Sequence, residues 1–431
     1  MICSNLENRG GTLCIGGADT TALIQKYGSP LYVMDEARIR NNCRVYLNAL
    51  REHLGSSARP LYASKAASFK RIYEIMREEG MGIDVVSCGE IYTAYRAGYP
   101  MASAYFHSNN KTDEDIRFAM EHSIGYFVVD NTEELIAINR IAGEMDKEQR
   151  VLLRLTPGID PHTYAAVATG NVDSKFGSAI ETGQAEQITL FALSLPNIRL
   201  SGFHCHVGSQ VFDADVFIRS VDIMMEFIAE MAYKHDYLAE ELDLGGGFGV
   251  RYVESDPTID IAANIAEIAQ RLKKKASEFD ILLPAIRMEP GRSIVADAGL
   301  TLYRVGTIKK IPGYKNYVSV DGGMTDNPRY ALYRSAYTVL LANKLNEGCD
   351  FNCSVVGRNC ESGDILQENV QLPASVSRDD VLAVLTTGAY NYAMASNYNR
   401  VPRLPIVMVN DSADYLAVRR ESLEDLIRND I

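Results

Sequence analysis

Short apolar runs alternate with longer amphipathic stretches between residues 59 and 289. The runs have the length of buried strands, and the stretches between them are long enough for crossover helices. Eight runs lie at 59–63, 81–86, 104–107, 125–129, 151–155, 198–203, 241–244 and 284–288. Helical spacing is clearest at 68–79, 112–121, 132–142, 213–233 and 259–279. Because eight βα units close into a parallel barrel, the sequence predicts an α/β fold with a TIM-type (β/α)8 barrel over residues 35–290.

The pattern changes after Arg292, where strand-like pieces are separated by glycine, proline and asparagine. These pieces lie at 301–311, 317–320, 381–385 and 404–409. They predict a β-rich C-terminal domain over residues 291–431. The run at 31–34 also has a strand's composition. We expect the N-terminal segment, residues 1–34, to contribute this strand to the β domain.

Charge and composition restrict the partners of the chain. It has 431 residues and a net charge of -13, and its longest basic run is Lys273 to Lys275. Such a charge repels nucleic acid and acidic membrane surfaces. No apolar stretch has the length of a signal-peptide core or a membrane span, and the eight cysteines form no dense framework. We therefore expect a soluble, cytoplasmic protein that binds neither nucleic acid nor membranes.

Polar side chains follow the C-terminal ends of most predicted strands, where barrels of this type carry their chemistry. They are Ser64 and Lys65, Asp84, Ser108 to Lys111, Arg154, His204 to Ser209, Gly245 to Gly249, and Glu289 to Arg292. We expect them to gather around one site. Three glycines at 245–247 let backbone amides approach a phosphate, although a tight βα turn has the same composition. Their spacing fits neither a dinucleotide fingerprint nor a Walker loop, so a bound phosphate would belong to a smaller molecule.

Lys65 and the two histidines have more than one interpretation. A lysine at a barrel mouth is usually solvated, but small apolar neighbours such as Ala66 can desolvate it enough to form a Schiff base. His204 and His206 suggest a metal, yet no third His or Cys with a fitting spacing follows, so we expect none. Stacking on a flat cofactor and a hydrogen-bonded place in the core are the other interpretations for a histidine.

Glu289 ends a predicted buried strand, where an unpaired carboxylate is costly. It should therefore meet a cation. An ion pair with Arg287 or Arg292 is one possibility. The other is a pyridinium nitrogen, which a facing carboxylate keeps protonated so that the ring becomes a strong electron sink.

Together these residues resemble the fold-type III decarboxylases, the family of ornithine and diaminopimelate decarboxylases, over residues 30–410. The resemblance implies that pyridoxal phosphate is the cofactor and that Lys65, within Tyr62 to Ala66, carries it. It gives His206 the role of stacking on the ring, and Glu289 that of facing its nitrogen. The phosphate site would comprise Ser209, Gly245, Gly246 and Gly247. Further cofactor-binding positions implied by the family are Asp84, Gly291, Arg292 and Tyr390.

Residues 321–333, 360–364, 388–390 and 394–399 resemble the diaminopimelate decarboxylase branch. This resemblance implies decarboxylation of meso-2,6-diaminopimelate to L-lysine and CO2, the last step of lysine biosynthesis. Arg292, Arg329 and Tyr333 would hold the distal carboxylate, Glu361 the distal ammonium, and Tyr390 would also touch the substrate. Cys360 would donate a proton. In the family, the positions of Cys360 and Glu361 reach the site from the partner subunit of a homodimer.

Other activities remain open at this point. A guanidinium forks onto a carboxylate, whereas ornithine needs an acid for its distal amine, so Arg329 favours diaminopimelate over ornithine, arginine or a carboxylated polyamine. A barrel racemase would have an arginine in place of Glu289, and a non-catalytic relative would commonly lack Lys65 or Cys360. Two residues depart from the family pattern: Ala67 replaces a frequent asparagine, and Ser108 a common glycine.

Overall fold

The computed structural model describes residues 1–159 and 175–431. Residue contacts divide the chain into two compact units. The barrel unit contains residues 43–249 and 259–291, and the β-sheet unit contains residues 1–42, 250–258 and 292–431. Among the described residues, no helix combines the length and the apolar character needed to cross a membrane.

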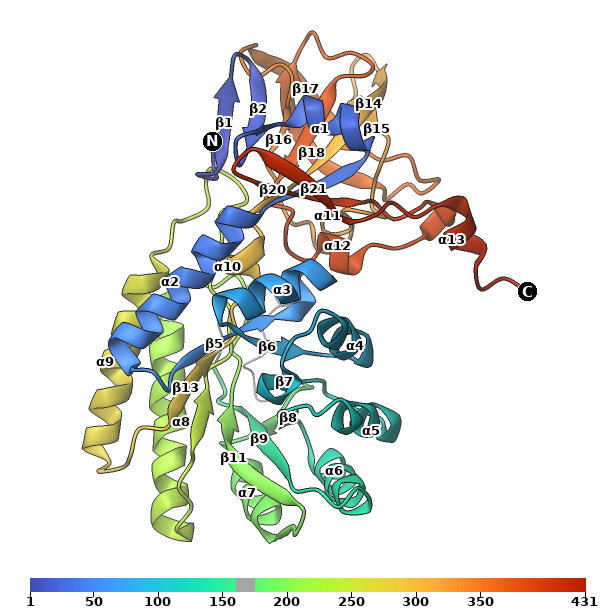
Figure 1. The fold of residues 1–431 in the computed structure, drawn as a ribbon. Coiled ribbons are helices and arrows are strands. Elements are labelled where there is room, and N and C mark those ends of the chain that lie inside the picture. Colours follow the sequence, from blue (N-terminus) through green and yellow to red (C-terminus); the bar gives the residue numbers. More distant parts are fainter. Residues whose placement is uncertain (160–174) are drawn as a thin grey trace. The chain divides into compact units, whose positions relative to one another are not determined.

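Eight parallel strands form a closed ring in the barrel unit (Figure 1). They are β5 (Arg59–Ala63), β6 (Gly82–Val85), β7 (Ala104–Phe106), β8 (Tyr126–Val129), β9 (Gln149–Thr156), β11 (Ile198–His204), β12 (Glu241–Asp243) and β13 (Ala285–Met288). Each strand pairs with the next in this order, and β13 pairs with β5 to close the ring. A two-residue strand, β10 (Ser178–Ala179), adds to β9. The predicted (β/α)8 barrel and its eight strands are confirmed.

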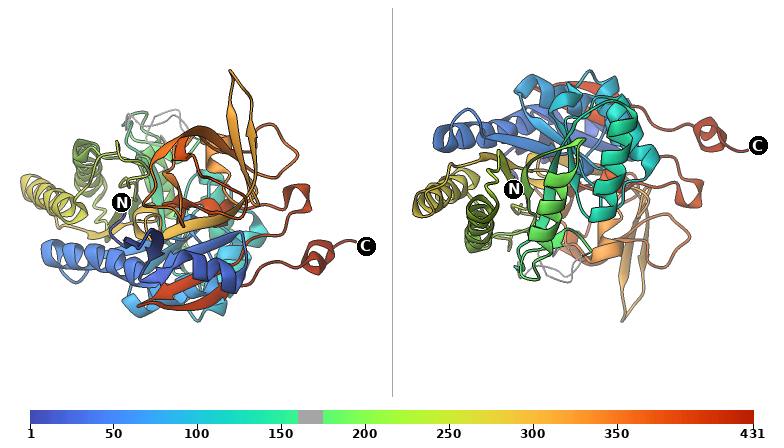
Figure 2. Two further views of the ribbon diagram at one scale, coloured as in Figure 1. Left: turned by 90° about the horizontal axis from the view of Figure 1, so that it is seen from above. Right: turned by 90° about the horizontal axis from the view of Figure 1, so that it is seen from below.

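Helices surround these strands, as the right-hand view of Figure 2 shows. They are α3 (Lys70–Glu79), α4 (Cys88–Arg96), α5 (Asp113–Glu121), α6 (Thr132–Glu144), α7 (Gln184–Ser194), α8 (Ala214–His235) and α9 (Ile261–Glu278). Side-chain caps begin several of them: Thr112 and Asp115 form a capping box on α5, and Asn131 caps α6. The five predicted helices are confirmed, whereas α4 and α7 were not predicted. Apolar residues of α7 point to solvent as well as to the core, so no clear amphipathic stripe marks it.

A long strand, β14 (Gly299–Lys310), organises the β-sheet unit. It pairs antiparallel with β4 (Leu31–Asp35), β15 (Asn316–Val320) and β19 (Val381–Leu385). The sheet continues from β4 to β20 (Ile406–Asn410) and β21 (Ala413–Val418), and from β15 to the hairpin of β17 (Cys349–Val356) and β18 (Ile365–Pro373). Strand β16 (Val339–Leu341) pairs with β19. The predicted β-rich part of the fold is confirmed, and the run at 31–34 lies inside this sheet.

The remaining elements of the β-sheet unit are short. A three-stranded sheet contains β1 (Leu6–Arg9), β2 (Thr12–Ile15) and β3 (Ala18–Asp19), and α1 (Thr20–Tyr27) follows it. The other helices are α10 (Arg292–Val295), α11 (Arg329–Tyr333), α12 (Asn391–Met394) and α13 (Leu423–Ile427). Two apolar cores fill the unit, one under the N-terminal sheet and one under β15, β17 and β18.

The first turns of α2 (Glu36–Leu54) belong to the β-sheet unit, although the sequence places residue 35 onward in the barrel. Polar contacts explain this. The amide of Asn42 donates to the carbonyl of Ile294 and to Asp297 at 3.0 Å each, and Arg38 donates to the same aspartate. Residues 250–258 join this unit as well, since the carbonyl of Tyr252 accepts from the backbone N–H of Thr338 at 3.0 Å.

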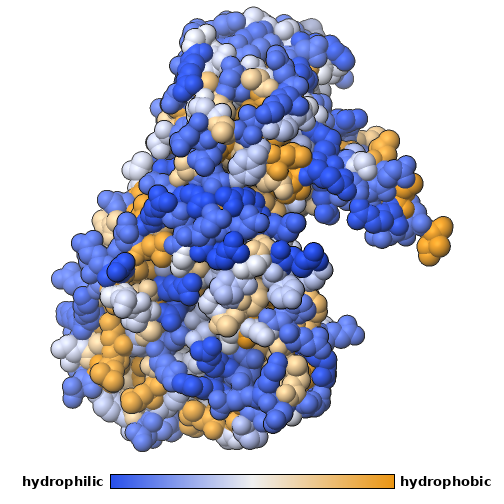
Figure 3. Space-filling model, viewed as in Figure 1, coloured by the Kyte–Doolittle hydropathy of each residue, from blue (hydrophilic) through white to orange (hydrophobic). Residues whose placement is uncertain are grey.

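The face of the molecule drawn in Figure 3 is mostly hydrophilic, with apolar residues in small groups. This distribution agrees with the net charge of -13.

Candidate active site

Lys65 lies at the C-terminal end of the barrel strands, in a 3-10 turn (Ser64–Ala66) that directly follows β5. The loop after β13 packs onto this turn. The backbone N–H of Ala63 donates to the carbonyl of Pro290 at 3.1 Å, and a side chain at Gly291 would press on Ala63 and Ala66. The alanines are buried, but Lys65 itself is exposed. The expected desolvation of its ammonium by these alanines is therefore not found in the single chain.

Asp84 faces the same rim from β6, where it is paired with Ala63 in register. Its side chain is buried, and within the described residues its Oδ1 atom has no hydrogen-bond partner. Burial and the negative charge of Glu289 raise the pKa of Asp84 well above its ordinary value, and the ammonium of Lys65 opposes them. Asp84 is thus a buried carboxyl with an oxygen left for a donor.

Glu289 meets two histidines, not Arg287. The Nε2 atom of His107 lies 2.7 Å from Oε1, with angles outside those of a regular hydrogen bond, and Nε2 of His204 lies 3.2 Å from Oε2. All three side chains are buried: His204 is the last residue of β11, and His107 and Glu289 directly follow β7 and β13. Arg287 instead donates to Glu241 at 2.8 Å. Two imidazoles, from strands far apart in the sequence, take the place expected for Arg287 beside Glu289.

Burial changes the charge state of this cluster. Burial lowers the pKa of His107 to about 4 and also lowers the pKa of His204, so both rings are neutral near pH 7. Burial alone would raise the pKa of Glu289, but the contacts with His107 and His204 outweigh it, and the pKa falls well below its ordinary value. The cluster therefore holds one carboxylate between two neutral rings. Its ligand atoms lie within 4.8 Å of one another, close enough to share a metal ion, and no ion is part of the structure.

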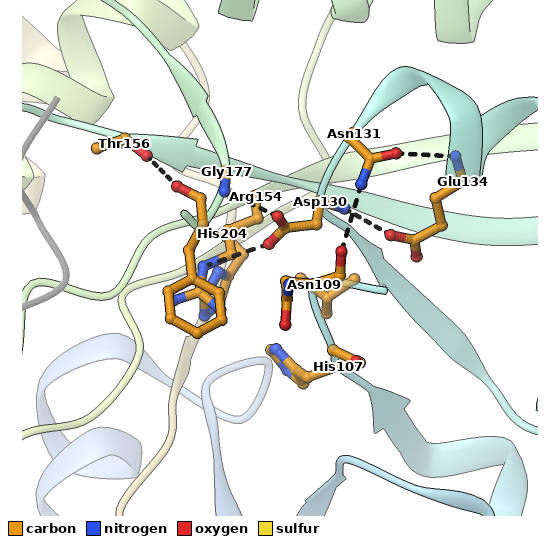
Figure 4. Close-up of polar contacts among 12 residues, drawn as sticks. His107, Asn109, Asp130, Asn131, Glu134, Arg154, Thr156, Gly177 and His204 are labelled. Carbon is orange, nitrogen blue, oxygen red and sulfur yellow. Dashed lines mark hydrogen bonds and ion pairs between the residues drawn. The ribbon is translucent and has the colours of Figure 1, made fainter. Parts of the chain in front are cut away.

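A second set of buried charges supports this rim (Figure 4). Arg154 of β9 lies 3.9 Å from Asp130, whose other oxygen accepts from the backbone N–H of Gly177 at 3.1 Å. The backbone N–H of Asp130 donates in turn to Glu134, and Lys111 pairs with the same glutamate at 2.6 Å. This network orders the ends of β8 and β9.

The glycine loop after β12 packs tightly against its neighbours. Side chains at Gly246 or Gly247 would clash with the carbonyls of Glu289 and Gly208. The N–H of Gly245 donates to Asp243 at 2.8 Å, and that of Gly246 to Nδ1 of His206 at 3.3 Å. Two of the three amides predicted to cradle a phosphate are therefore engaged within the protein. The second bond leaves the ring proton of neutral His206 on Nε2.

Ser209 lies beside this glycine loop. The two loops pair through an isolated bridge between Val211 and Phe248, and the backbone N–H of Val211 donates to the carbonyl of Gly247 at 2.9 Å. Ser209 and His206 are half-buried. The barrel thus brings together the predicted Lys65, Asp84, His206, Ser209, Gly245, Gly246, Gly247, Glu289 and Gly291. It adds His107 and Asp130, which were not among the predicted polar strand ends, and it places His204, which was among them, beside Glu289.

The other predicted residues lie in the β-sheet unit, where two guanidinium groups share one tyrosine ring. Arg292 lies 4.9 Å and Arg329 lies 5.2 Å from the ring centroid of Tyr390. Arg292 also donates to the hydroxyl of Tyr252 at 2.7 Å, and Arg329 lies 5.1 Å from the ring of Tyr333. Both arginines are buried. Arg292 and Arg329, two buried cations beside the same aromatic ring, form a site that attracts an anion.

Cys360 and Glu361 lie together on the loop between β17 and β18, and both are exposed. Asn399 accepts from the backbone N–H of Cys360 at 2.8 Å. Glu361 lines an open cavity of about 310 Å³ with Leu332 and Tyr398. Thr169, Gly170, Asp173 and Ser174, which also resemble a loop of the family, lie outside the described residues.

Comparisons with known proteins agree with this arrangement. Residues 36–296 match the family model described as pyridoxal-dependent decarboxylase, pyridoxal binding domain. A diaminopimelate decarboxylase of Bacillus methanolicus is 45% identical over 96% of each chain, and one of Bacillus subtilis (strain 168) is 43% identical over 99% of this chain and 96% of the relative. The crystal structure of the M. jannaschii diaminopimelate decarboxylase in complex with L-lysine superposes with a TM-score of 0.93 at 34% identity, covering 100% of this chain and 98% of the other.

Proposed function

Because the chain belongs to the pyridoxal-dependent decarboxylases and, within them, to the diaminopimelate decarboxylases, we propose that it converts meso-2,6-diaminopimelate into L-lysine and CO2. This would be the last step of lysine biosynthesis. The family resemblance read from the sequence is confirmed, and pyridoxal phosphate is the cofactor. The observation that carries the choice of substrate is Arg329, a buried cation whose Nε atom has no acceptor among the described residues.

The barrel rim fits pyridoxal phosphate. Lys65 is exposed at the strand ends and accessible for a covalent bond to the cofactor, and buried Asp84 has an oxygen without a donor beside it. Glu289 supplies a buried negative charge for the ring nitrogen. Ser209 and Gly247 line the loop pair proposed for the phosphate. When bound, the cofactor supplies a protonated ring that accepts the electron pair released by loss of CO2.

The residues of the chain divide the remaining work. Lys65 would hold the cofactor through its side-chain amine. Neutral His206 offers a flat, uncharged ring for stacking, because burial and the cations Lys65 and Arg154 lower its pKa well below its ordinary value. Cys360 holds the proton that returns to the carbon atom after decarboxylation.

Substrate choice is assigned to the β-sheet unit. Arg329, Arg292 and Tyr333 bind the distal carboxylate, and Glu361 binds the distal ammonium. A guanidinium satisfies a carboxylate with two parallel hydrogen bonds, and it repels the distal amine of ornithine. Decarboxylation of ornithine, arginine or a carboxylated polyamine is the alternative within the same fold.

The proposed enzyme is a cytoplasmic homodimer with shared active sites. The exposure of Cys360 and Glu361 in the single chain suits residues that complete a site in a partner. All eight cysteines are free thiols, which suits a reducing compartment.

Borohydride reduction followed by peptide mapping tests the role of Lys65. Borohydride fixes the bond between the cofactor and its lysine, so the label should appear on the peptide that contains Lys65. The Lys65→Ala protein is the control and should remain unlabelled there. A label on another lysine, or none in the wild type, would refute the proposed cofactor site.

A substrate panel tests the reaction. CO2 release should be measured from meso-diaminopimelate, ornithine, arginine and lysine under identical conditions. We expect release from meso-diaminopimelate alone, with L-lysine as its product. Preference for ornithine or arginine would support the alternative activity and would leave the proposed cofactor site unchanged.

A further inference from the structure

The carboxylate of Glu289 is held from two sides. His107 directly follows β7, and His204 is the last residue of β11. Each ring turns its Nε2 atom to a different oxygen of Glu289, at 2.7 and 3.2 Å. The two rings contact each other edge to face, with centroids 4.9 Å apart and planes at 71°. The two rings therefore contact each other as well as the carboxylate, and these contacts restrict the orientation of all three groups.

The short contacts determine where the ring protons lie. An unprotonated nitrogen 2.7 Å from a carboxylate oxygen would repel it, so His107 must carry its proton on Nε2. The same holds for His204, whose Nε2 makes the hydrogen bond at 3.2 Å. Each neutral ring thus presents an N–H group to Glu289. Hydrogen bonds to the charged form of a carboxyl favour that form.

The surroundings of Glu289 contain further titratable groups, on other strands. Asp243 of β12 and Asp84 of β6 are buried acids, and burial with the charge of Glu289 raises the pKa of each well above its ordinary value. Burial raises the pKa of the Cys205 thiol to about 12. Arg154 and Lys65 are the nearby cations. The shifts in pKa favour the neutral forms of the two aspartates and the charged form of Glu289.

We propose that His107 and His204 are positioning residues that hold Glu289 as an oriented carboxylate and so set the charge that it presents to the ring nitrogen of pyridoxal phosphate. This rests on the function proposed above and assigns the regulation of the electron-accepting ring to two residues that the sequence did not assign to the cofactor. Neither histidine needs to touch the substrate. Removing their N–H groups leaves the buried carboxyl beside the side chain of Asp243 with fewer hydrogen-bond donors, which favours its protonation.

The test compares binding of two cofactors. One is pyridoxal phosphate, and the other is its analogue in which a C–H group replaces the ring nitrogen. Dissociation constants should be measured for the wild type, His107→Leu, His204→Leu and the double variant. His107→Gln and His204→Gln serve as conservative variants, because the glutamine amide keeps an N–H group near the place of Nε2. His122→Leu is the matched control, since His122 lies on the barrel surface and contacts Phe118.

We expect the leucine variants to bind pyridoxal phosphate about tenfold more weakly, the size of effect seen when supporting partners of a ligand are removed. Their affinity for the analogue should match that of the wild type, and the glutamine variants should recover most of the loss. Equal weakening of binding for both cofactors would indicate a merely structural role for the histidines and would overturn the proposal. Unchanged binding of both cofactors would also overturn it.

Two further measurements distinguish the proposal from poor folding of the variants and from metal binding. With ring-15N-labelled pyridoxal phosphate, the nitrogen shift should report a protonated ring in the wild type and glutamine variants, and loss of that proton at lower pH in the leucine variants. An unchanged shift in every variant would contradict the proposal even if some variants fold poorly. A stoichiometric metal in the purified holoenzyme, lost on chelation, would assign the three side chains to metal binding instead. Absence of borohydride label on Lys65 would refute the proposed function itself, a result separable from all of these.

Discussion

At the scale of single residues, Arg329 is a buried cation without a described carboxylate partner. Its neighbours are the rings of Tyr333 and Tyr390, which stabilise the charge only in part. A buried guanidinium with an unused Nε atom is costly, and a bound carboxylate removes the cost. In the proposed function, the pairing of Arg329 with the distal carboxylate would therefore contribute binding energy for the substrate.

Replacement of Arg329 by glutamine should raise KM for meso-diaminopimelate and change kcat much less. Loss of a charge-assisted hydrogen bond corresponds to a roughly ten- to hundredfold increase in KM. Steady-state kinetics on the holoenzyme measures both constants. Arg378→Gln is the control, because Arg378 is an exposed arginine on the same unit. An unchanged KM would show that the distal carboxylate binds elsewhere.

Lys111 and Glu134 form the most buried ion pair of the barrel unit's described residues, with side chains 0% and 2% exposed. The ammonium also donates to the carbonyls of Val128 and Ser108, at 2.9 and 3.0 Å. This satisfies the lysine fully. It also ties the loop that contains Ser108, where φ is +154°, a value better suited to glycine.

Glu134→Gln should therefore destabilise the protein by about 3 kcal/mol or more, because it leaves a buried ammonium without its counter-charge. Urea denaturation gives the difference in free energy of unfolding. Glu144→Gln is the comparison, since its pair with Arg140 is exposed and its loss should have a much smaller effect. Equal effects in the two variants would contradict the importance of burial.

Lys65 and Glu289 were predictable because each polar residue ends an apolar run, whereas the role of His107 was not. His107 lies inside the apolar run at 104–107, and the polar residues predicted for the site after this run start at Ser108. Extending the same rule by one residue would have found it. The contact between His107 and Glu289 could not be predicted, because it depends on how two strands far apart in the sequence face each other across the closed ring.

At the scale of elements, closure of the barrel depends on a glycine in β11. A side chain at Gly202 would clash with the carbonyl of Glu241 on the neighbouring strand β12. The pairing of β11 with β9 also shifts in register between Leu200 and Gly202. A glycine here allows the two backbones to approach and the strand to bend. His204, two residues later, depends on this bend for its place at Glu289.

Gly202→Ala should therefore destabilise the barrel by about 3 kcal/mol, the upper end of the range for overpacking. The melting temperature and urea midpoint measure the loss. Gly89→Ala is a control on α4, where an added Cβ meets a single atom at 3.6 Å and alanine favours the helix. If both variants have the melting temperature of the wild type, β11 and β12 are not as closely packed as described.

The barrel strands were easier to predict than those of the β-sheet unit, for a physical reason. Parallel barrel strands are buried on both faces, so they are continuous apolar runs. The hairpin of β17 and β18 has one exposed face and contains Asn352, Gln367, Glu368 and Gln371, so it has no such run. The hairpin was therefore not anticipated, although β14, β15, β19 and β20 were.

At the scale of the whole molecule, we propose that the site is completed by a second chain. Most residues proposed for the cofactor are carried by the barrel unit, with Arg292 and Tyr390 in the β-sheet unit, while the proposed proton donor Cys360 is exposed on the loop between β17 and β18. An exposed thiol is a poor place to keep a catalytic proton unless a partner covers it. The assignment of Cys360 to a neighbouring subunit's site follows from this exposure and from the family pattern.

Mixing two inactive proteins tests the shared site directly. Lys65→Ala and Cys360→Ala each remove one component, but a hybrid dimer has one site in which both are intact. Random exchange at equal concentrations makes half of the dimers hybrid, so activity should recover to about one quarter of the wild-type value. The control pair is Lys65→Ala with Glu289→Ala, because both changes lie in the barrel and no hybrid site is then complete. Differently tagged subunits show that exchange has occurred, and exchange without recovery would place Cys360 in the site of its own chain or outside the reaction.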